Sequence, residues 1–256
     1  MQIDVSFLPA LGATFLLIFA RTGTMMMLLP GIGEQGISPR MRLTAALILA
    51  AVLVPLHRQD YHLVAGTLGP AIVLVVEEII IGAVLGISAR LTISALDLAG
   101  AIIAQALGLG FVTAVDPGQG EQSMIVGNFL TMLAITLFFA TDMHYLVLAA
   151  LNDSYTLFAP GEVPSTGDVA ALVTKVTAGA FRIGIQLSAP FMVYALLFNI
   201  GLGVLSRLMP AMQVYFLAMP ASILGGFLFL ILVLGTMMGM FLDYTASVLH
   251  QIAPHA

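Results

Sequence analysis

Residues 183–242 read IGIQLSAPFMVYALLFNIGLGVLSRLMPAMQVYFLAMPASILGGFLFLILVLGTMMGMFL, and Arg207 is the only charged side chain among these 60 positions. It lies in a short polar break, residues 206–213, with an apolar run on each side. Each run exceeds the roughly 20 residues that a helix needs to cross about 30 Å of hydrocarbon. The stretch therefore predicts two membrane helices joined by a tight turn, a helical hairpin near the C-terminal end.

The whole chain has the composition of a membrane protein. Of its 256 residues, 60% are hydrophobic and 8% are charged, whereas a soluble domain carries about 25% charged residues. Backbone polar groups must pair within a segment where no water is present, so spans this apolar are predicted to be helices. The short segments of alternating polarity that a transmembrane β-barrel needs are not seen. We predict an all-α, polytopic membrane-protein helical bundle.

Charge and residue usage exclude several classes of function. A net charge of −5 with eight Lys plus Arg argues against nucleic-acid binding, which needs a basic patch. The absence of cysteine excludes disulfides and thiolate-bound metals. No basic side chain precedes the first apolar run, so we expect that run to stay as structure rather than to be a cleaved signal. The absence of Trp is either chance or a sign that much of the surface faces protein.

The sequence contains seven apolar runs, which are separated by polar or Gly/Pro-rich breaks. The gaps are too short for a soluble domain, so we predict one domain, 1–256, with no linker to a second. One run, 43–56, has 14 residues, which is short of a full span. Breaks are expected at 88–90 and 141–175, among others. The runs cover residues 7–29, 43–56, 68–87, 91–112, 123–140, 177–205 and 214–240.

Positive charges indicate which segment does not cross the membrane. Arg40 and Arg42 place the first loop in the cytoplasm, and two further crossings return the chain there at Arg90. The acidic loop 141–173 then lies outside. Residues 123–140 must cross outward, so residues 91–122 must enter and come back. This parity predicts a re-entrant loop over residues 108–120, which is permitted at membrane depth only where it is buried in protein or lines a cavity.

Four ionisable residues inside apolar runs are candidates for buried charges: Arg21, Glu77, Glu78 and Asp97. A charge in a membrane segment usually faces a bundle interior or a watery cavity. Adjacent helical residues point about 100° apart, so Glu77 and Glu78 do not suit a dyad acting on one substrate atom. We expect one of them to pair with Arg21 or Arg90, or to face a polar interior.

The sequence offers little for catalysis. Its five histidines show no His-Glu-x-x-His pair, and His57 and His62 are five positions apart, which does not suit a helical metal site. We expect these two histidines in a solvated loop. No catalytic residue, metal or cofactor is predicted, and the chain is not expected to be an enzyme.

Several motifs bear on packing and on loop shape. Gly82 with Gly86, and Gly235 with Gly239, form small-x-x-x-small patterns that permit close helix contact. The methionines are more typical of gap filling than of a seal. Residues 116–120, Asp-Pro-Gly-Gln-Gly, predict a tight, shaped loop or an ordinary surface turn. Because a buried amide needs a hydrogen bond, Asn199 is expected to have a partner across a helix interface.

These residues carry a resemblance to a known family. The stretch from Gln186 to Pro190, the run Asn199 to Phe216 with its Ser-Arg-Leu-Met-Pro-Ala-Met-Gln core, and Pro220 resemble the signature of the FliR family of flagellar biosynthesis proteins. The similarity extends over essentially the whole chain. Further agreement lies at Arg21, Pro30, residues 39–42, residues 105–110, Asp116, Pro117 and residues 141–145.

The resemblance implies a non-enzymatic subunit of a type III protein export gate in the bacterial inner membrane, at the flagellar basal body. Expected partners are FliP and FliQ in a channel core, FlhB and FlhA beside it, and the exported unfolded flagellar proteins. It also implies a FliP-like part, 1–175, and a FliQ-like part, 176–256, whose hairpin covers 181–240. A plug loop would include Leu107, Gly108, Gly110, Phe111, Asp116, Pro117 and Gly120, and subunit packing would involve Gln186, Pro190, Asn199, Gly201, Gly203, Arg207, Pro210 and Gln213.

Three alternatives remain open at this point. The equivalent subunit of a virulence injectisome would share the mechanism and differ in cargo. A secondary transporter would use Glu77, Glu78 or Asp97 as an ion site, although the sequence lacks the repeat symmetry that such folds often show. An intramembrane enzyme has the least support.

Overall fold

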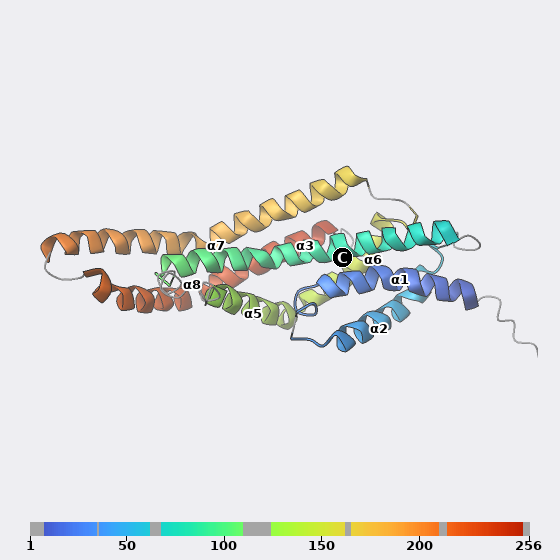
Figure 1. Ribbon diagram of the computed structural model, residues 1–256, viewed down its shortest axis with the longest axis horizontal. Coiled ribbons are helices and arrows are strands. Elements are labelled where there is room, and N and C mark those ends of the chain that lie inside the picture. The colour runs from blue at the N-terminus through green and yellow to red at the C-terminus, as the bar shows by residue number, and fades with distance from the viewer. Residues whose placement is uncertain are drawn as a thin grey trace, which may run out of the picture. The chain divides into compact units, whose positions relative to one another are not determined.

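The computed structural model describes residues 8–34, 36–61, 68–109, 124–161, 165–209 and 214–252 (Figure 1). These residues form seven helices and no strand, which confirms the all-α prediction. The helices are α1 (Leu8–Leu28), α2 (Pro39–His57), α3 (Leu68–Ala106), α5 (Met124–Ala140), α6 (Met143–Leu157), α7 (Thr166–Leu208) and α8 (Val214–Ile252).

Five of the described helices, α1, α2, α3, α7 and α8, are long and apolar enough to cross a membrane. Helices α5 and α6, which meet at Thr141 and Asp142, would make a sixth span if counted together. The predicted break of the C-terminal hairpin is confirmed, because α7 ends at Leu208 and α8 begins at Val214.

Helix α2 corrects the expectation of a helix too short to span. It begins at Pro39 and has 19 residues. Ser38 caps its N-terminus by accepting a hydrogen bond from the Met41 amide, and Pro39 takes a first-turn position where no amide proton is needed. The first turn is therefore polar in sequence yet helical in structure. Pro55, near the other end, also lies within the helix.

Helix α3 corrects a second expectation, because it runs through the predicted break at residues 88–90 as one helix of 39 residues. The Ser88 hydroxyl donates to the Val84 carbonyl at 2.7 Å, and Thr92 donates to Ser88 in the same way. Polar side chains are thus satisfied within the helix. The chain does not turn at Arg90, so the parity argument for residues 91–122 fails, and residues 110–123 of the predicted loop lie outside the described residues.

The predicted loop 141–175 also contains regular structure. Helix α6 occupies 15 of its residues and starts after Asp142, whose backbone is left-handed with φ of 60°. Asp is one of the few side chains that tolerate this conformation. Pro160 and Gly161 follow the end of α6, and both residue types disfavour continuation of a helix.

The chain divides into two compact units that interleave along the sequence. Unit 1 comprises residues 1–92, 142–177 and 246–256, and unit 2 comprises residues 93–141 and 178–245. Unit 1 buries polar side chains among its apolar ones. Unit 2 has an apolar core in which Leu96, Leu130, Phe191 and Phe241, from α3, α5, α7 and α8, are almost wholly inaccessible to solvent.

Candidate functional site

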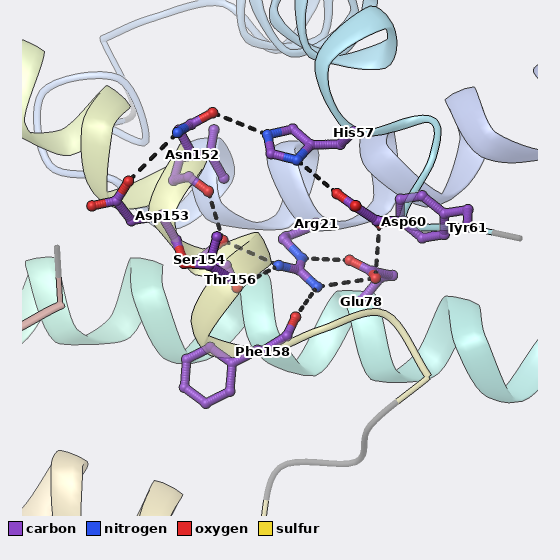
Figure 2. Close-up of polar contacts among 11 residues, drawn as sticks. Arg21, His57, Asp60, Tyr61, Glu78, Asn152, Asp153, Ser154, Thr156 and Phe158 are labelled. Carbon is purple, nitrogen blue, oxygen red and sulfur yellow. Dashed lines mark hydrogen bonds and ion pairs between the residues drawn. The ribbon is translucent and has the colours of Figure 1, made fainter. Parts of the chain in front are cut away.

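Arg21, on α1 in unit 1, is fully buried and makes five side-chain hydrogen bonds. A guanidinium has five N–H donors, and all five are used (Figure 2). Nε and Nη2 donate to the two carboxylate oxygens of Glu78 on α3. Nη1 donates to the carbonyl and hydroxyl oxygens of Ser154, and Nη2 also donates to the Phe158 carbonyl. Arg21 therefore joins α1 to α3 and to the end of α6.

Glu78 has a second partner in Tyr61, which lies in the turn after α2 (Figure 2). The Tyr61 hydroxyl donates to Glu78 Oε1 at 2.9 Å. Burial, and to a smaller extent the Glu78 carboxylate, raise the pKa of the Tyr61 phenol well above its ordinary value. The phenol therefore keeps its proton and remains a donor.

His57, at the end of α2, contradicts the expectation of a solvated histidine because it is buried. Its Nδ1 lies 2.9 Å from Asp60 Oδ2, and its Nε2 lies 3.0 Å from Asn152 Oδ1 on α6 (Figure 2). Its ring stacks on Tyr155 with centroids 4.0 Å apart. The Arg21 guanidinium carbon lies 4.1 Å from the centroid of the same Tyr155 ring. His62 lies outside the described residues.

The remaining buried-charge candidates differ from one another. Glu77 is buried, and its Oε2 has no hydrogen-bond partner. Asp97, expected to be buried, is instead exposed on α3 and accepts a hydrogen bond from the Thr131 hydroxyl at 3.1 Å. Glu78 has the predicted partner, Arg21, whereas Arg90 is exposed.

The predicted plug loop begins where α3 ends. Residues 107–109, the root of this loop, are among those that the structure describes. Gly108 has a φ of 84°, a left-handed conformation that favours glycine. The Leu109 amide donates to the Ala104 carbonyl, and the Gly108 amide donates to the Gln105 carbonyl. This pair of bonds is a Schellman C-cap, which ends the helix. Gly110, Phe111, Asp116, Pro117 and Gly120 lie outside the described residues.

Leu107 fixes this root against α8. Its side chain is fully buried and lies against Gly226, where an added Cβ would collide with it. The Ser222 hydroxyl donates to the Leu107 carbonyl at 3.4 Å. A groove of about 460 Å³ adjoins the root, and its lining includes Gln105, Asn199 and Ser222. Leu107 is therefore an anchor, and the chain leaves α3 from a fixed point.

The predicted subunit-packing residues that are described lie on α7. Asn199 departs from expectation because it is exposed and donates to the Ala195 carbonyl of its own helix at 2.8 Å. Pro190 is half-buried inside the helix, and Pro210 and Gln213 lie outside the described residues. The exposed members are Gln186, Asn199, Gly201, Gly203 and Arg207.

Sequence reasoning missed most partners of the buried cluster. Asp60, Tyr61, Asn152, Ser154 and Phe158 were not singled out, and no spacing rule links them to Arg21 or His57. Arg21 and Ser154 are 133 positions apart, and His57 and Asn152 are 95 apart. The available signal was Arg21 itself, an arginine inside an apolar run that needs acceptors. Among the described residues, no three His, Asp or Glu side chains are grouped as a metal would require.

Comparison with known proteins places this architecture in a family. Residues 12–248 match the model of the bacterial export proteins, family 1. The flagellar biosynthetic protein FliR of Caulobacter vibrioides is 40% identical over 210 residues, covering 82% of this chain and 84% of that protein. The FliR of Pectobacterium carotovorum is 28% identical, covering 84% and 82% of the two chains. For the FliR of Escherichia coli the identity is 27%, with 77% and 75% covered.

These matches cover the helices that carry both the Arg21 cluster and the α3 root. The chain belongs to the FliR family of bacterial export proteins.

Proposed function

We propose that the chain is a structural subunit of the flagellar type III export gate, forming the channel core with FliP and FliQ in the bacterial inner membrane at the flagellar basal body. FlhB and FlhA are the further partners, and unfolded flagellar proteins are the cargo. Membership of the FliR family makes the chain a component of flagellar export machinery. The finer role follows from the surface of α7.

The observation that carries the proposal is a set of exposed polar side chains and glycines on a helix long and apolar enough to span the membrane. Gln186, Asn199 and Arg207 are all exposed on α7. Amides and guanidinium groups facing lipid are costly, and such side chains normally face protein or water. Gly201 and Gly203 leave open space around their backbone, which permits close approach by a neighbouring helix. These exposed positions on α7 support packing against other subunits.

The division of labour within the chain belongs to the same proposal. Residues 1–175 act as the FliP-like part and residues 176–256 as the FliQ-like part, so that one chain closes a ring of FliP and FliQ copies. Flagellar relatives support the flagellar system over an injectisome. The subunit has a structural role and performs no catalysis.

Co-purification tests the assembly. The tagged chain is expressed with FliP and FliQ from the same genome in mild detergent, and the mass and subunits of the product are determined. We expect a stable complex of all three proteins, and Gly203→Leu should reduce its yield because a bulky side chain fills the packing surface. Gly12→Leu is the matched control, since Gly12 on α1 also has nothing within 4 Å. A chain that purifies alone and ignores both partners would refute the assembly.

The loop after α3 is proposed as the plug of the resting pore. Its root is fixed by the buried Leu107 and the left-handed Gly108, so the following residues leave from a defined position. Deleting residues 110–120 while keeping Leu107 and Gly108 should permit assembly and raise leakage of ions and small solutes through the complex in liposomes. Replacing Leu107 by Ala should loosen the root and give a smaller leak. Ion tightness unchanged by the deletion would rule out the plug role.

A further inference from the structure

His57 has an unusual pair of neighbours for a buried histidine. Each of its ring nitrogens lies within hydrogen-bond distance of an oxygen, Oδ2 of Asp60 on one side and Oδ1 of Asn152 on the other. The two oxygens come from different elements, the turn after α2 and helix α6 (Figure 2). The ring therefore connects the end of α2 to α6.

The hydrogen-bond donors and acceptors around His57 determine how many protons its ring needs in this geometry. A carboxylate and an amide oxygen only accept hydrogen bonds, and a neutral imidazole has one donor and one acceptor. A neutral His57 would therefore direct a lone pair at one of the two oxygens. Two N–H donors, as in the imidazolium, satisfy both. We propose that His57 is a buried proton-binding site whose second proton links the end of α2 to α6.

The orientation of the Asn152 amide supports this assignment. Its Nδ2 faces Asp153 Oδ1 at 3.5 Å, which leaves Oδ1 facing His57 (Figure 2). Turning the amide over would direct its oxygen at the Asp153 carboxylate, where two acceptors would oppose each other. The neighbouring carboxylate therefore fixes which atom His57 meets.

Asp60 is the carboxylate that contacts His57 directly. Asp153 on α6 and Glu78 on α3 are further carboxylates of the cluster, and they contact Asn152 and Arg21 rather than His57. An imidazolium gives Asp60 a cationic partner. The Tyr155 ring stacks on His57, and an aromatic face stabilises a cation. The Arg21 guanidinium also lies over that ring, with its carbon 4.1 Å from the ring centroid. The phenols of Tyr61, which donates to Glu78, and of Tyr155 are further titratable groups of this cluster.

Proton loss has a definite consequence for the fold. When His57 is neutral, one of its two hydrogen bonds is lost and a lone pair opposes an oxygen. The link between α2 and α6 is therefore strongest when His57 carries both protons and weakens when the second proton is lost. This property is separate from the export role and does not rest on it.

The test measures thermal unfolding of the full chain in mild detergent at about pH 5 and about pH 8. We expect the wild-type melting temperature to fall by at least about 2 °C between them, which corresponds to the loss of one hydrogen bond in a chain of this size. Asp60→Asn should remove most of this fall, because an asparagine amide donates to a neutral Nδ1. His250→Gln, at an exposed histidine of α8, is the matched control and should leave the fall unchanged.

Nitrogen-15 NMR of histidine-labelled protein gives a second readout that does not depend on unfolding. At about pH 5 we expect one histidine with both ring nitrogens protonated and slow exchange with solvent. That signal should disappear in His57→Gln and persist in His250→Gln. A His57 ring that carries one proton at about pH 5, or a pH dependence of melting that Asp60→Asn leaves intact, overturns the proposal.

Discussion

Each of the two units is stabilised internally by a different kind of contact. Unit 1 buries Arg21 and Glu78 as an ion pair and surrounds them with Tyr61, Ser154 and the Phe158 carbonyl. Unit 2 has an almost entirely apolar core, and its helices approach closely at glycines, as where Gly100 of α3 meets Gly127 of α5. One unit depends on a few specific polar partners, and the other depends on shape.

The difference predicts different sensitivity to mutation. A buried charge that loses its partner is strongly destabilising, because nothing else solvates it. A packed apolar core tolerates hydrophobic substitutions of similar volume and responds chiefly to added bulk. In lipid, where apolar surface gains little from leaving the solvent, close packing and polar bonds are the forces that remain. Unit 1 combines close packing with buried polar bonds, whereas unit 2 relies mainly on close packing.

The largest effect is expected from Arg21→Leu. The variant leaves Glu78 buried with Tyr61 as its remaining donor, so the free energy of unfolding should fall by about 3–5 kcal/mol. Thermal unfolding in detergent measures the change, and Arg90→Leu, at an exposed arginine of α3, serves as control. Adding Glu78→Leu to Arg21→Leu should recover part of the loss, because the unpaired charge is removed. Equal stability of the two arginine variants would contradict the importance of the cluster.

An intermediate effect is expected from Gly100→Ala. A Cβ at this position would collide with the backbone of Gly127, which has no flexible side chain to move aside. Overpacking of this kind costs about 1–3 kcal/mol. Gly239→Ala is the matched control on α8, where nothing lies within 4 Å, and it should be neutral or stabilising by up to about 1 kcal/mol because alanine favours helix. The melting temperatures of the two variants should therefore shift in opposite directions or differ by several degrees.

The smallest effect is expected from Tyr61→Phe, which removes one donor to Glu78 while both Arg21 bonds remain. The loss should be about 1 kcal/mol at neutral pH. Because burial raises the pKa of the Tyr61 phenol, the folded protein keeps a proton that the unfolded chain releases near pH 10. The contribution of Tyr61 to stability is therefore present below about pH 10 and decreases above it. The wild type should lose more stability than Tyr61→Phe when unfolding is measured from about pH 9 to about pH 11.

Glycine pairs show how far a sequence motif can be interpreted. Gly82 and Gly86 on α3, a predicted close-contact pair, do meet α1, where added Cβ atoms would collide with the Arg21 carbonyl and with Leu28. Gly235 and Gly239 on α8 have the same spacing and open space around them. Spacing places two small residues on one face of a helix, but only packing brings a second helix to that face.

Helix boundaries show a similar division. The apolar runs predicted the bounds of α1 and α5 closely, because the cost of exposing a peptide group in hydrocarbon depends on local composition. The runs 177–205 and 214–240 identified α7 and α8, but α7 begins earlier, at Thr166, and α8 ends later, at Ile252. Residues 88–90 were wrongly predicted as a break, since Ser88 satisfies its hydroxyl within the helix. The polar first turn of α2 was missed for a related reason, because Ser38 and Pro39 favour helix initiation. Polarity alone does not distinguish a loop from a helix whose polar groups are bonded locally.

The sequence by itself determined the fold class, the apolar helices, the turn between α7 and α8, and Arg21 as a residue in need of acceptors. These properties depend on composition and on near neighbours along the chain. Tertiary structure alone decided which acceptors Arg21 meets, why His57 lies between Asp60 and Asn152, and where glycines permit contact. The partners of Arg21 come from positions 57 to 137 residues away. Such pairings depend on how helices pack in three dimensions, and no local pattern encodes them.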